Sequence, residues 1–266
     1  MRIRALVLAA SGAVALSALA VPAAQAATPA AGPAVTFSQL KVNSGKNIVV
    51  GPTTQVTVSA TYTVTKPASL NPNSIKTGPV LYQGTLSLDN DRVLGGDGPG
   101  TCTVSSTTVL KCSAKIQFRP KSSDTDADLV NNAAGTWKLG AVAVNDSGVT
   151  LQGDLGTTHL QRRATLTTDA SPEPVKKGRT ITVTGKLSRA NWDTNKYAGY
   201  STQPVKLQFK KKGATTWSTL KTIKSSSTGA LKTTVKASAD GYFRYTFAGT
   251  TTTSPVNSAA DYIDVR

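Results

Sequence analysis

Hydrophobic and polar residues alternate along much of this chain. Between Gln55 and Val64, for example, valine, alanine or tyrosine fills every second position, and threonine or serine lies between them. A period of two residues is typical of an antiparallel strand with one buried face. The pattern predicts strands at Gln55–Val64, Val80–Leu88, Thr101–Ser105, Val109–Phe118, Thr136–Asn145, Thr180–Leu187, Val205–Lys210, Leu231–Lys236 and Tyr242–Ala248.

Glycine and proline separate these segments at turn spacing, and no stretch keeps a helical period. The chain is therefore predicted to be all-β, with two immunoglobulin-like antiparallel β-sandwich domains at 35–162 and 163–266. Few residues separate a strand ending near Leu160 from one starting near Ala164, so we expect a short linker. In the last long strand, Phe243, Tyr245 and Phe247 are expected to face the core.

The N-terminus has the pattern of a secretory signal peptide. Two arginines precede an uncharged stretch from Ala5 to Val21, and small residues occupy Ala24 and Ala26. Cleavage is expected after Ala26, which makes 1–26 the signal peptide and 27–34 a flexible N-terminal segment. The alternative, a membrane anchor, needs a longer apolar run and a stop signal beyond it, so no membrane insertion is expected. The mature protein is predicted to be secreted, either extracellular or loosely associated with the cell wall.

The amino-acid composition limits which residues could carry out catalysis. The 266 residues include a single histidine, His159, a single glutamate, Glu173, and two cysteines. These residues leave few candidates for an acid, a base or a nucleophile, and no carboxylate pair suits glycoside cleavage. The sequence therefore predicts a protein that is not an enzyme and needs no cofactor.

Cys102 and Cys112 flank a β-rich run whose midpoint can turn the chain at Ser106–Thr108. Placing residue 105 opposite 109 and counting outward sets the two cysteines opposite each other. In an oxidising compartment this arrangement predicts a cross-strand disulfide. The alternative, a metal or redox pair, requires closer spacing and further ligands.

Positive charge is concentrated in the second half of the chain. The mature part up to Arg162 carries 11 lysines and arginines against 8 aspartates, a net of +3, whereas the part from Arg163 carries 17 against 6, a net of +11. Apolar neighbours at inward positions force alternating lysines outward. The lysines predicted to form a basic face are Lys186, Lys206, Lys210, Lys232 and Lys236. Such lysines also protect sheet edges from pairing with other chains, which is the alternative explanation.

A basic face attracts anionic polymers by counterion release. For an exported protein the accessible partners are anionic cell-wall or matrix polymers, including teichoic-type phosphates, acidic polysaccharide and extracellular DNA. No motif of a sequence-specific nucleic-acid fold is present, so we expect non-specific attraction.

An aromatic segment, Ser188–Ser201, is expected to form a long loop between two strands. Trp192, Tyr197 and Tyr200 in this loop can stack on sugar rings, which makes the loop a candidate sugar site. Alternatively, the rings fold back and cap the sandwich, because aromatic side chains bury a large apolar area.

Asp124, Asp126 and Asp128 alternate in a short acidic segment. Three carboxylates at this spacing are suitable oxygen ligands for Ca²⁺, and a calcium-binding structural protein is the second functional hypothesis. The EF-hand pattern is excluded, because Leu129 and Gly135 stand where it needs glycine and glutamate. The alternative is a solvated acidic loop.

Several motifs of the second domain follow one another in the order Gly178–Leu187, Pro204–Gly213, Trp217, Asp240–Gly249 and Tyr262–Val265. This order resembles the bacterial immunoglobulin-like modules of secreted actinobacterial proteins. Gly135–Gly148 is similar to the closing strands of such modules, which suggests a tandem arrangement. The resemblance implies an extracellular or cell-surface accessory protein, and some relatives are labelled calcium-binding. It implies no catalytic residue.

Overall fold

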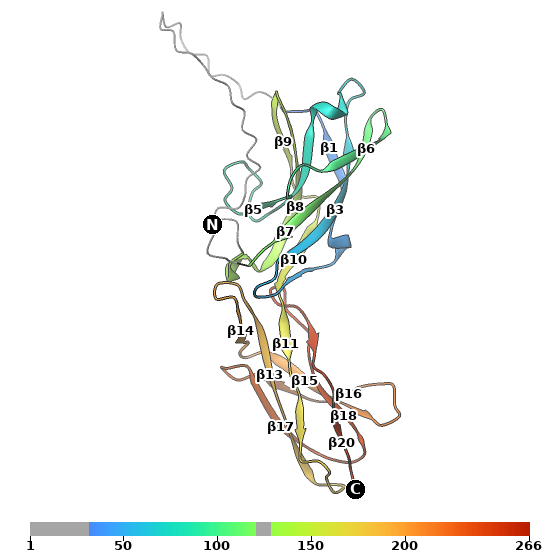
Figure 1. The fold of residues 1–266 in the computed structure, drawn as a ribbon, viewed down its shortest axis with the longest axis vertical. Coiled ribbons are helices and arrows are strands. Elements are labelled where there is room, and N and C mark those ends of the chain that lie inside the picture. The colour runs from blue at the N-terminus through green and yellow to red at the C-terminus, as the bar shows by residue number, and fades with distance from the viewer. Residues whose placement is uncertain (1–31, 121–128) are drawn as a thin grey trace, which may run out of the picture.

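The computed structural model describes residues 32–120 and 129–266, and these residues form β-strands with three short 3₁₀ helices. The prediction of an all-β protein is therefore confirmed. Figure 1 shows two sandwiches stacked end to end, the first built from β1–β10 and the second from β11–β20. In the described residues, no helix has the length and apolar character needed to cross a membrane.

The first sandwich consists of two sheets. One sheet has the strand order β1 (Thr36–Val42), β3 (Val56–Thr65), β7 (Val109–Phe118) and β6 (Thr101–Ser106). The other has the order β2 (Ile48–Val50), β10 (Thr157–Arg162), β8 (Gly135–Asn145), β4 (Lys76–Tyr82) and β5 (Val93–Gly95), and β9 (Gly148–Gln152) also pairs with β8. The helices are η1 (Asn43–Gly45), η2 (Pro72–Ser74) and η3 (Asn131–Ala133).

The strand order of the first sandwich is immunoglobulin-like. Strands β1, β3, β7 and β6 occupy the places of A, B, E and D, and β10, β8 and β4 occupy those of G, F and C. β2 pairs in parallel with β10, as an additional strand beside G. The disulfide, however, joins the neighbouring strands β6 and β7 rather than the two sheets.

The second sandwich also has two sheets. In one, β13 (Thr180–Asn191) pairs with β11 (Ala164–Leu166), β12 (Asp169–Ser171), β14 (Lys196–Gly199) and β17 (Ala230–Lys236). In the other, β15 (Pro204–Lys211) lies between β16 (Ser218–Lys224) and β18 (Gly241–Phe247), which also pairs with β19 (Val256–Asn257) and β20 (Asp261–Ile263). A sheet in the order A-B-E faces one built from C′, C, F and G, which is again an immunoglobulin-like arrangement.

The alternation pattern located most long strands, but it missed β1 and β16 and shifted one other strand. The segment Val80–Leu88 was predicted as a strand, whereas β4 spans Lys76–Tyr82. The chain leaves the sheet after Tyr82 because Gly84 adopts a positive φ of 79°, a conformation that glycine reaches without strain. The apolar residues beyond Gly84 therefore lie outside the sheet.

The disulfide hairpin confirms the predicted pairing of the two cysteines. Cys102 and Cys112 are register partners and are covalently joined. The predicted turn was wrong by one residue, because Ser106 rather than Ser105 pairs with Val109. The register shifts between Val104 and Ser106, and this bulge absorbs the additional residue so that the cysteines still meet.

Each sandwich has its own cluster of buried apolar side chains. In the first, the ring of Trp137 is buried and its Nε1 donates a hydrogen bond to the carbonyl oxygen of Ala133 at 2.8 Å. In the second, Phe243, Tyr245 and Phe247 are buried, which confirms their predicted inward orientation. The hydroxyl of Tyr245 donates to the carbonyl oxygen of Val183 at 2.9 Å, linking the two sheets.

Alkaline pH is expected to destabilise the second sandwich through Tyr245. Burial raises the pKa of this phenol to about 12, whereas the pKa of a tyrosine in the unfolded chain is about 10. The native state therefore favours the neutral phenol. The contribution of this phenol to the free energy of unfolding is complete below about pH 10 and is lost as the pH rises towards about 12. Chemical denaturation at pH 9 and pH 11 should show a smaller loss of stability for Tyr245→Phe than for the wild type. An equal loss in both proteins would contradict this assignment.

Candidate functional site

The lysines predicted to form one basic face lie on two sheets. Lys206 and Lys210 belong to β15, whereas Lys186 lies on β13, and Lys232 and Lys236 lie on β17. Figure 1 shows β13 and β17 on one side of the second sandwich and β15, β16 and β18 on the other. The prediction of a single face was therefore wrong. Alternation sends a lysine outward from its own sheet, but which strands share a sheet depends on long-range pairing.

The sheet around β15 also carries aromatic side chains on its outer face. On β18, Phe243, Tyr245 and Phe247 face the core, so Tyr242 and Arg244 face outward. The register places Gln208 opposite Arg244 and Lys210 opposite Tyr242. These pairings bring cations and rings from separate strands together.

We call this cluster the aromatic–basic ladder; its members are Lys210, Trp217, Tyr242, Arg244 and Tyr262. The guanidinium carbon of Arg244 lies 4.1 Å from the ring centroid of Trp217, and its Nε donates to Oε1 of Gln208 at 2.9 Å. The Lys210 ammonium lies 5.2 Å from the Trp217 centroid and 5.3 Å from that of Tyr242. The rings of Tyr242 and Tyr262 are 5.1 Å apart. Each cation is therefore held against at least one aromatic ring.

A further lysine next to the ladder, Lys212, is paired with a carboxylate. The ammonium of Lys212 lies 5.7 Å from the Tyr262 centroid and forms an ion pair with Asp240 at 3.5 Å. Hydrogen bonding to Tyr262 is the main cause that raises the pKa of Lys212, while a hydrogen bond from the backbone N–H of Val265 is the main cause that lowers the pKa of Asp240. Lys212 thus has its own carboxylate, which leaves Lys210 and Arg244 as the cations available to a ligand.

Of the five ladder residues, the sequence pattern predicts only Lys210 as a site residue; it assigns no site to Trp217, Tyr242, Arg244 or Tyr262. The outward orientation of Tyr242 and Arg244 follows from the inward orientation of their neighbours, so the direction of these two side chains could be predicted from the sequence. Trp217 lies just before β16, outside any alternating segment. Its place beside Arg244 depends on the pairing of β15 with both β16 and β18.

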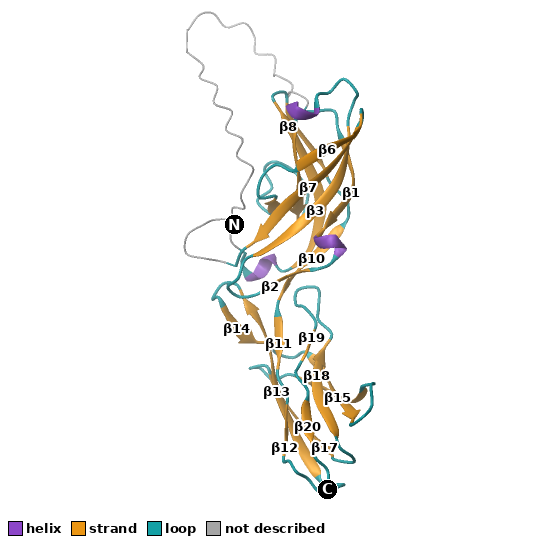
Figure 2. Ribbon diagram, turned by 45° about the vertical axis from the view of Figure 1, so that its right-hand side comes forward, coloured by secondary structure: helices purple, strands orange, loops and turns teal. Residues whose placement is uncertain are grey.

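The aromatic segment Ser188–Ser201 is a β-hairpin rather than a long loop. β13 continues to Asn191, the chain turns, and β14 returns antiparallel beside it with Asn191 opposite Lys196. Figure 2 shows β14 at the junction between the two sandwiches. The turn therefore reaches the base of the first sandwich.

Trp192, at this turn, is fully buried and belongs to the apolar cluster of the first sandwich. Its Nε1 donates to the carbonyl oxygens of Val50 and Gly51, at 3.4 and 3.0 Å. A ring with no exposed surface cannot stack on a ligand, so the prediction that Trp192 binds sugar was wrong. Burial was the alternative expected from the sequence, but the ring enters the neighbouring sandwich instead of capping its own.

The two tyrosines of the predicted sugar site have surroundings that differ from those of the buried Trp192. Tyr200 is half-buried, edge-on against Phe247 with a centroid distance of 5.8 Å, and the guanidinium of Arg189 covers its ring at 3.9 Å. Tyr197 is 42% exposed. The three rings therefore form no shared stacking platform, which corrects the predicted sugar site.

Polar contacts complete the junction around Trp192. The side-chain oxygen of Asn131 accepts from the backbone N–H of Trp192 at 2.9 Å, and its Nδ2 donates to Asn191 at 2.8 Å. The buried Arg162 donates from Nε to the carbonyl oxygen of Ala190 at 2.5 Å. Burial, together with the nearby Arg189, lowers the pKa of Arg162 to about 10. Only Arg163 separates β10 from β11.

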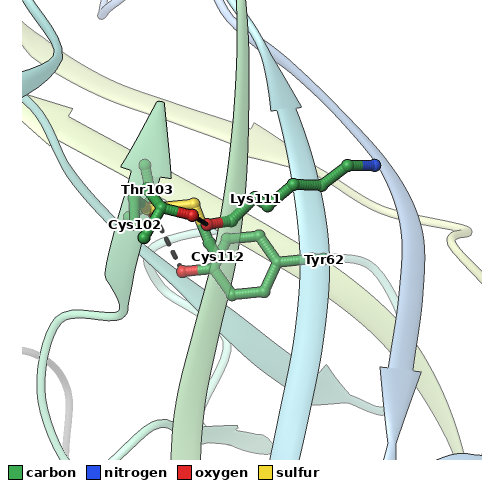
Figure 3. Close-up of a disulfide and its surroundings, with 6 residues drawn as sticks. Tyr62, Cys102, Thr103, Lys111 and Cys112 are labelled. Carbon is green, nitrogen blue, oxygen red and sulfur yellow. Dashed lines mark hydrogen bonds between the residues drawn. A yellow bond between two sulfur atoms is a disulfide. The ribbon is translucent and has the colours of Figure 1, made fainter. Parts of the chain in front are cut away.

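A shallow pocket of about 360 Å³ lies beside the disulfide on the first sandwich. Its walls carry hydroxyl groups from strands β3, β6 and β7, and Figure 3 shows Tyr62 and Lys111 beside Cys102 and Cys112. The ammonium of Lys111 already donates to Gln39 at 3.2 Å and to Thr63 at 3.0 Å. Because its one cation is engaged within the protein, this pocket is less suited to anions than the ladder.

The candidate calcium ligands Asp124, Asp126 and Asp128 lie outside the described residues, so the calcium site stays a prediction. In the ranges 32–120 and 129–266, no group of three or more histidine, cysteine or acidic side chains is placed to hold a metal ion.

No family model and no curated protein matches this sequence. Similar solved structures include a chimeric titin Z1Z2–Z1Z2 tandem, with 14% identity over 87% of this chain and 99% of that chain and a TM-score of 0.30. The D00–D0 domain of intimin is 15% identical over 86% of this chain and 99% of that chain, with a TM-score of 0.28. These likenesses are too distant to indicate a function.

Proposed function

We propose that this protein is a non-enzymatic, exported binding module that attaches to anionic envelope or matrix polymers through the basic outer surface of its second sandwich. The observation that carries the proposal is the uneven distribution of charge. The second half of the chain has a net charge of +11, against +3 for the mature first half. Charge of one sign on an accessible surface attracts polyanions and releases their counterions.

The positions of the lysines support a binding role. Lys186 and Lys206 lie on β13 and β15, which have paired strands on both sides, so protection of a sheet edge does not explain them. Lys232 and Lys236 lie on β17, where edge protection remains a sufficient explanation. Ion pairs between described residues are Lys138–Asp154, Lys212–Asp240 and Arg266–Asp264. Within the described part, carboxylates therefore neutralise none of these four outward lysines of β13, β15 and β17.

Composition supports a non-enzymatic role, and the disulfide supports export. Both cysteines are used in the disulfide, so neither is available as a nucleophile. His159 and Glu173 are the only residues of their types in the chain. Disulfides persist in oxidising compartments, in agreement with the predicted signal peptide.

The proposal predicts that binding depends on where the positive charge lies. A variant with glutamine at Lys186, Lys206, Lys232 and Lys236 should bind purified cell-wall polymer about tenfold or more weakly than the wild type at low salt. The matched control carries glutamine at the exposed lysines of the first sandwich, Lys41, Lys46, Lys76 and Lys115. Both variants have the same net charge.

Pull-down across a salt gradient measures the difference. We expect earlier elution of the second-sandwich variant than of the control. Equal elution of the two variants, or wild-type retention that persists at high salt, would refute the proposed charge-driven attachment.

A further inference from the structure

The aromatic–basic ladder differs from an ordinary lysine-rich surface because its cations are held in place. Arg244 is fixed by the Trp217 ring and by Gln208, and the ammonium of Lys210 lies close to two rings. All five members of the ladder are half-buried, whereas Lys206, Lys232 and Lys236 are exposed. A long side chain that is already ordered loses less conformational freedom when it binds an anion. The ladder is thus prepared for anions in a way that the exposed lysines are not.

The free donors of the ladder suit a planar anion. The Nε of Arg244 is used by Gln208, and among the described residues its two terminal nitrogens make no hydrogen bond. A guanidinium edge with free nitrogens pairs with a carboxylate through two parallel hydrogen bonds. Lys206 and Lys210 flank Gln208 at alternate positions of β15, which places successive polar groups about 7 Å apart along the strand. The row therefore fits anionic groups repeated along a linear polymer.

The aromatic rings of the ladder place a second requirement on the ligand. Trp217, Tyr242 and Tyr262 keep part of their surface exposed beside the cations. A ligand that covers this surface must offer apolar C–H groups between its charges, and the pyranose rings of an acidic polysaccharide do so. We propose that the ladder is a binding site for a linear carboxylated polysaccharide. This inference rests on the proposed function and specifies its polymer and its site.

A single-stranded nucleic acid fits the ladder less well. Proteins that bind such strands stack bases on open aromatic faces, but the Arg244 guanidinium lies over the Trp217 ring and Lys210 is close to it. A poly(alditol phosphate) offers charge but no sugar ring in its backbone to cover the exposed aromatic surface. The observations therefore favour the polysaccharide.

The test compares two charge-matched double variants of the full chain by titration calorimetry with polygalacturonate. We expect Lys210→Gln/Arg244→Gln to bind about tenfold more weakly than Lys232→Gln/Lys236→Gln, which removes the same charge from the opposite sheet. Trp217→Leu keeps every charge but removes the ring that holds the cations, and we expect it to lose about threefold in affinity. Circular dichroism verifies that each variant is folded.

The outcomes separate the two proposals. If the wild type binds no anionic polymer, the proposed function fails and the ladder site fails with it. If the wild type binds but both double variants lose equal affinity, attachment by charge stands and the ladder site is refuted. If polyphosphate or single-stranded DNA displaces polygalacturonate from the wild type at equal or lower charge concentration, the polysaccharide class is wrong.

Discussion

Replacing Trp192 with alanine is expected to lower the free energy of unfolding by about 3–5 kcal/mol, the range for deletion of a fully buried indole. The ring has no exposed surface and packs in the apolar cluster of the first sandwich, although its backbone belongs to the second. The substitution also removes the hydrogen bond that Nε1 donates to Gly51. The two sandwiches should consequently lose their coupling as well as their stability.

Calorimetry and urea denaturation measure both effects. We expect one coupled transition in the wild type and two separate transitions in Trp192→Ala. Tyr197→Ala is the matched control, because it removes an aromatic ring from the same hairpin at a position that is 42% exposed. Its effect should remain within about 0.5 kcal/mol, as for most surface substitutions. Unchanged unfolding of Trp192→Ala would contradict the role of this ring at the junction.

Removing the disulfide with Cys102→Ser/Cys112→Ser is expected to lower the free energy of unfolding by about 2–3 kcal/mol. The bond closes a loop between residues ten positions apart, and closing a loop restricts the unfolded chain. Most residues of β6 are exposed, and β6 pairs only with β7 among the described strands. We therefore expect the loss to be concentrated in β6, where amide hydrogen exchange should accelerate.

Reduction of the wild type provides the control for this variant. Urea denaturation of the reduced wild type should match that of the double variant, because both lack the same covalent bond. Amides of the second sandwich that exchange through local openings should keep their exchange rates, since the apolar cluster of this sandwich is separate. Equal stability of the oxidised wild type and the double variant would exclude a stabilising role for the disulfide.

These two predictions show how far the fold could be derived from the sequence. The hairpin was accessible because it is local: the short run between the cysteines brings them together even though the turn shifts by one residue. The short strands β2, β5 and β19 were not, because two or three residues carry no readable alternation. Such strands exist because longer neighbours offer them a hydrogen-bonding edge.

The candidate site shows the same limit. The outward direction of each lysine was predictable from its neighbours, but the division of the lysines between two sheets was not. The aromatic residues illustrate the point further, because Trp192 is buried in the adjoining sandwich whereas Trp217 supports a cation on the outer face. Composition alone treats the two tryptophans alike, and only their partners distinguish them.

Local pattern thus established the all-β class, the inward and outward direction of side chains on the long strands, the disulfide and the excess of positive charge in the second half. These properties depend on residues close together in the chain, where a period of two has one structural meaning. Tertiary structure alone decided which strands share a sheet, which rings hold Lys210 and Arg244, and that Trp192 joins the two sandwiches. Those outcomes depend on pairings between distant segments, and the stability of such pairings comes from packing that no single segment specifies.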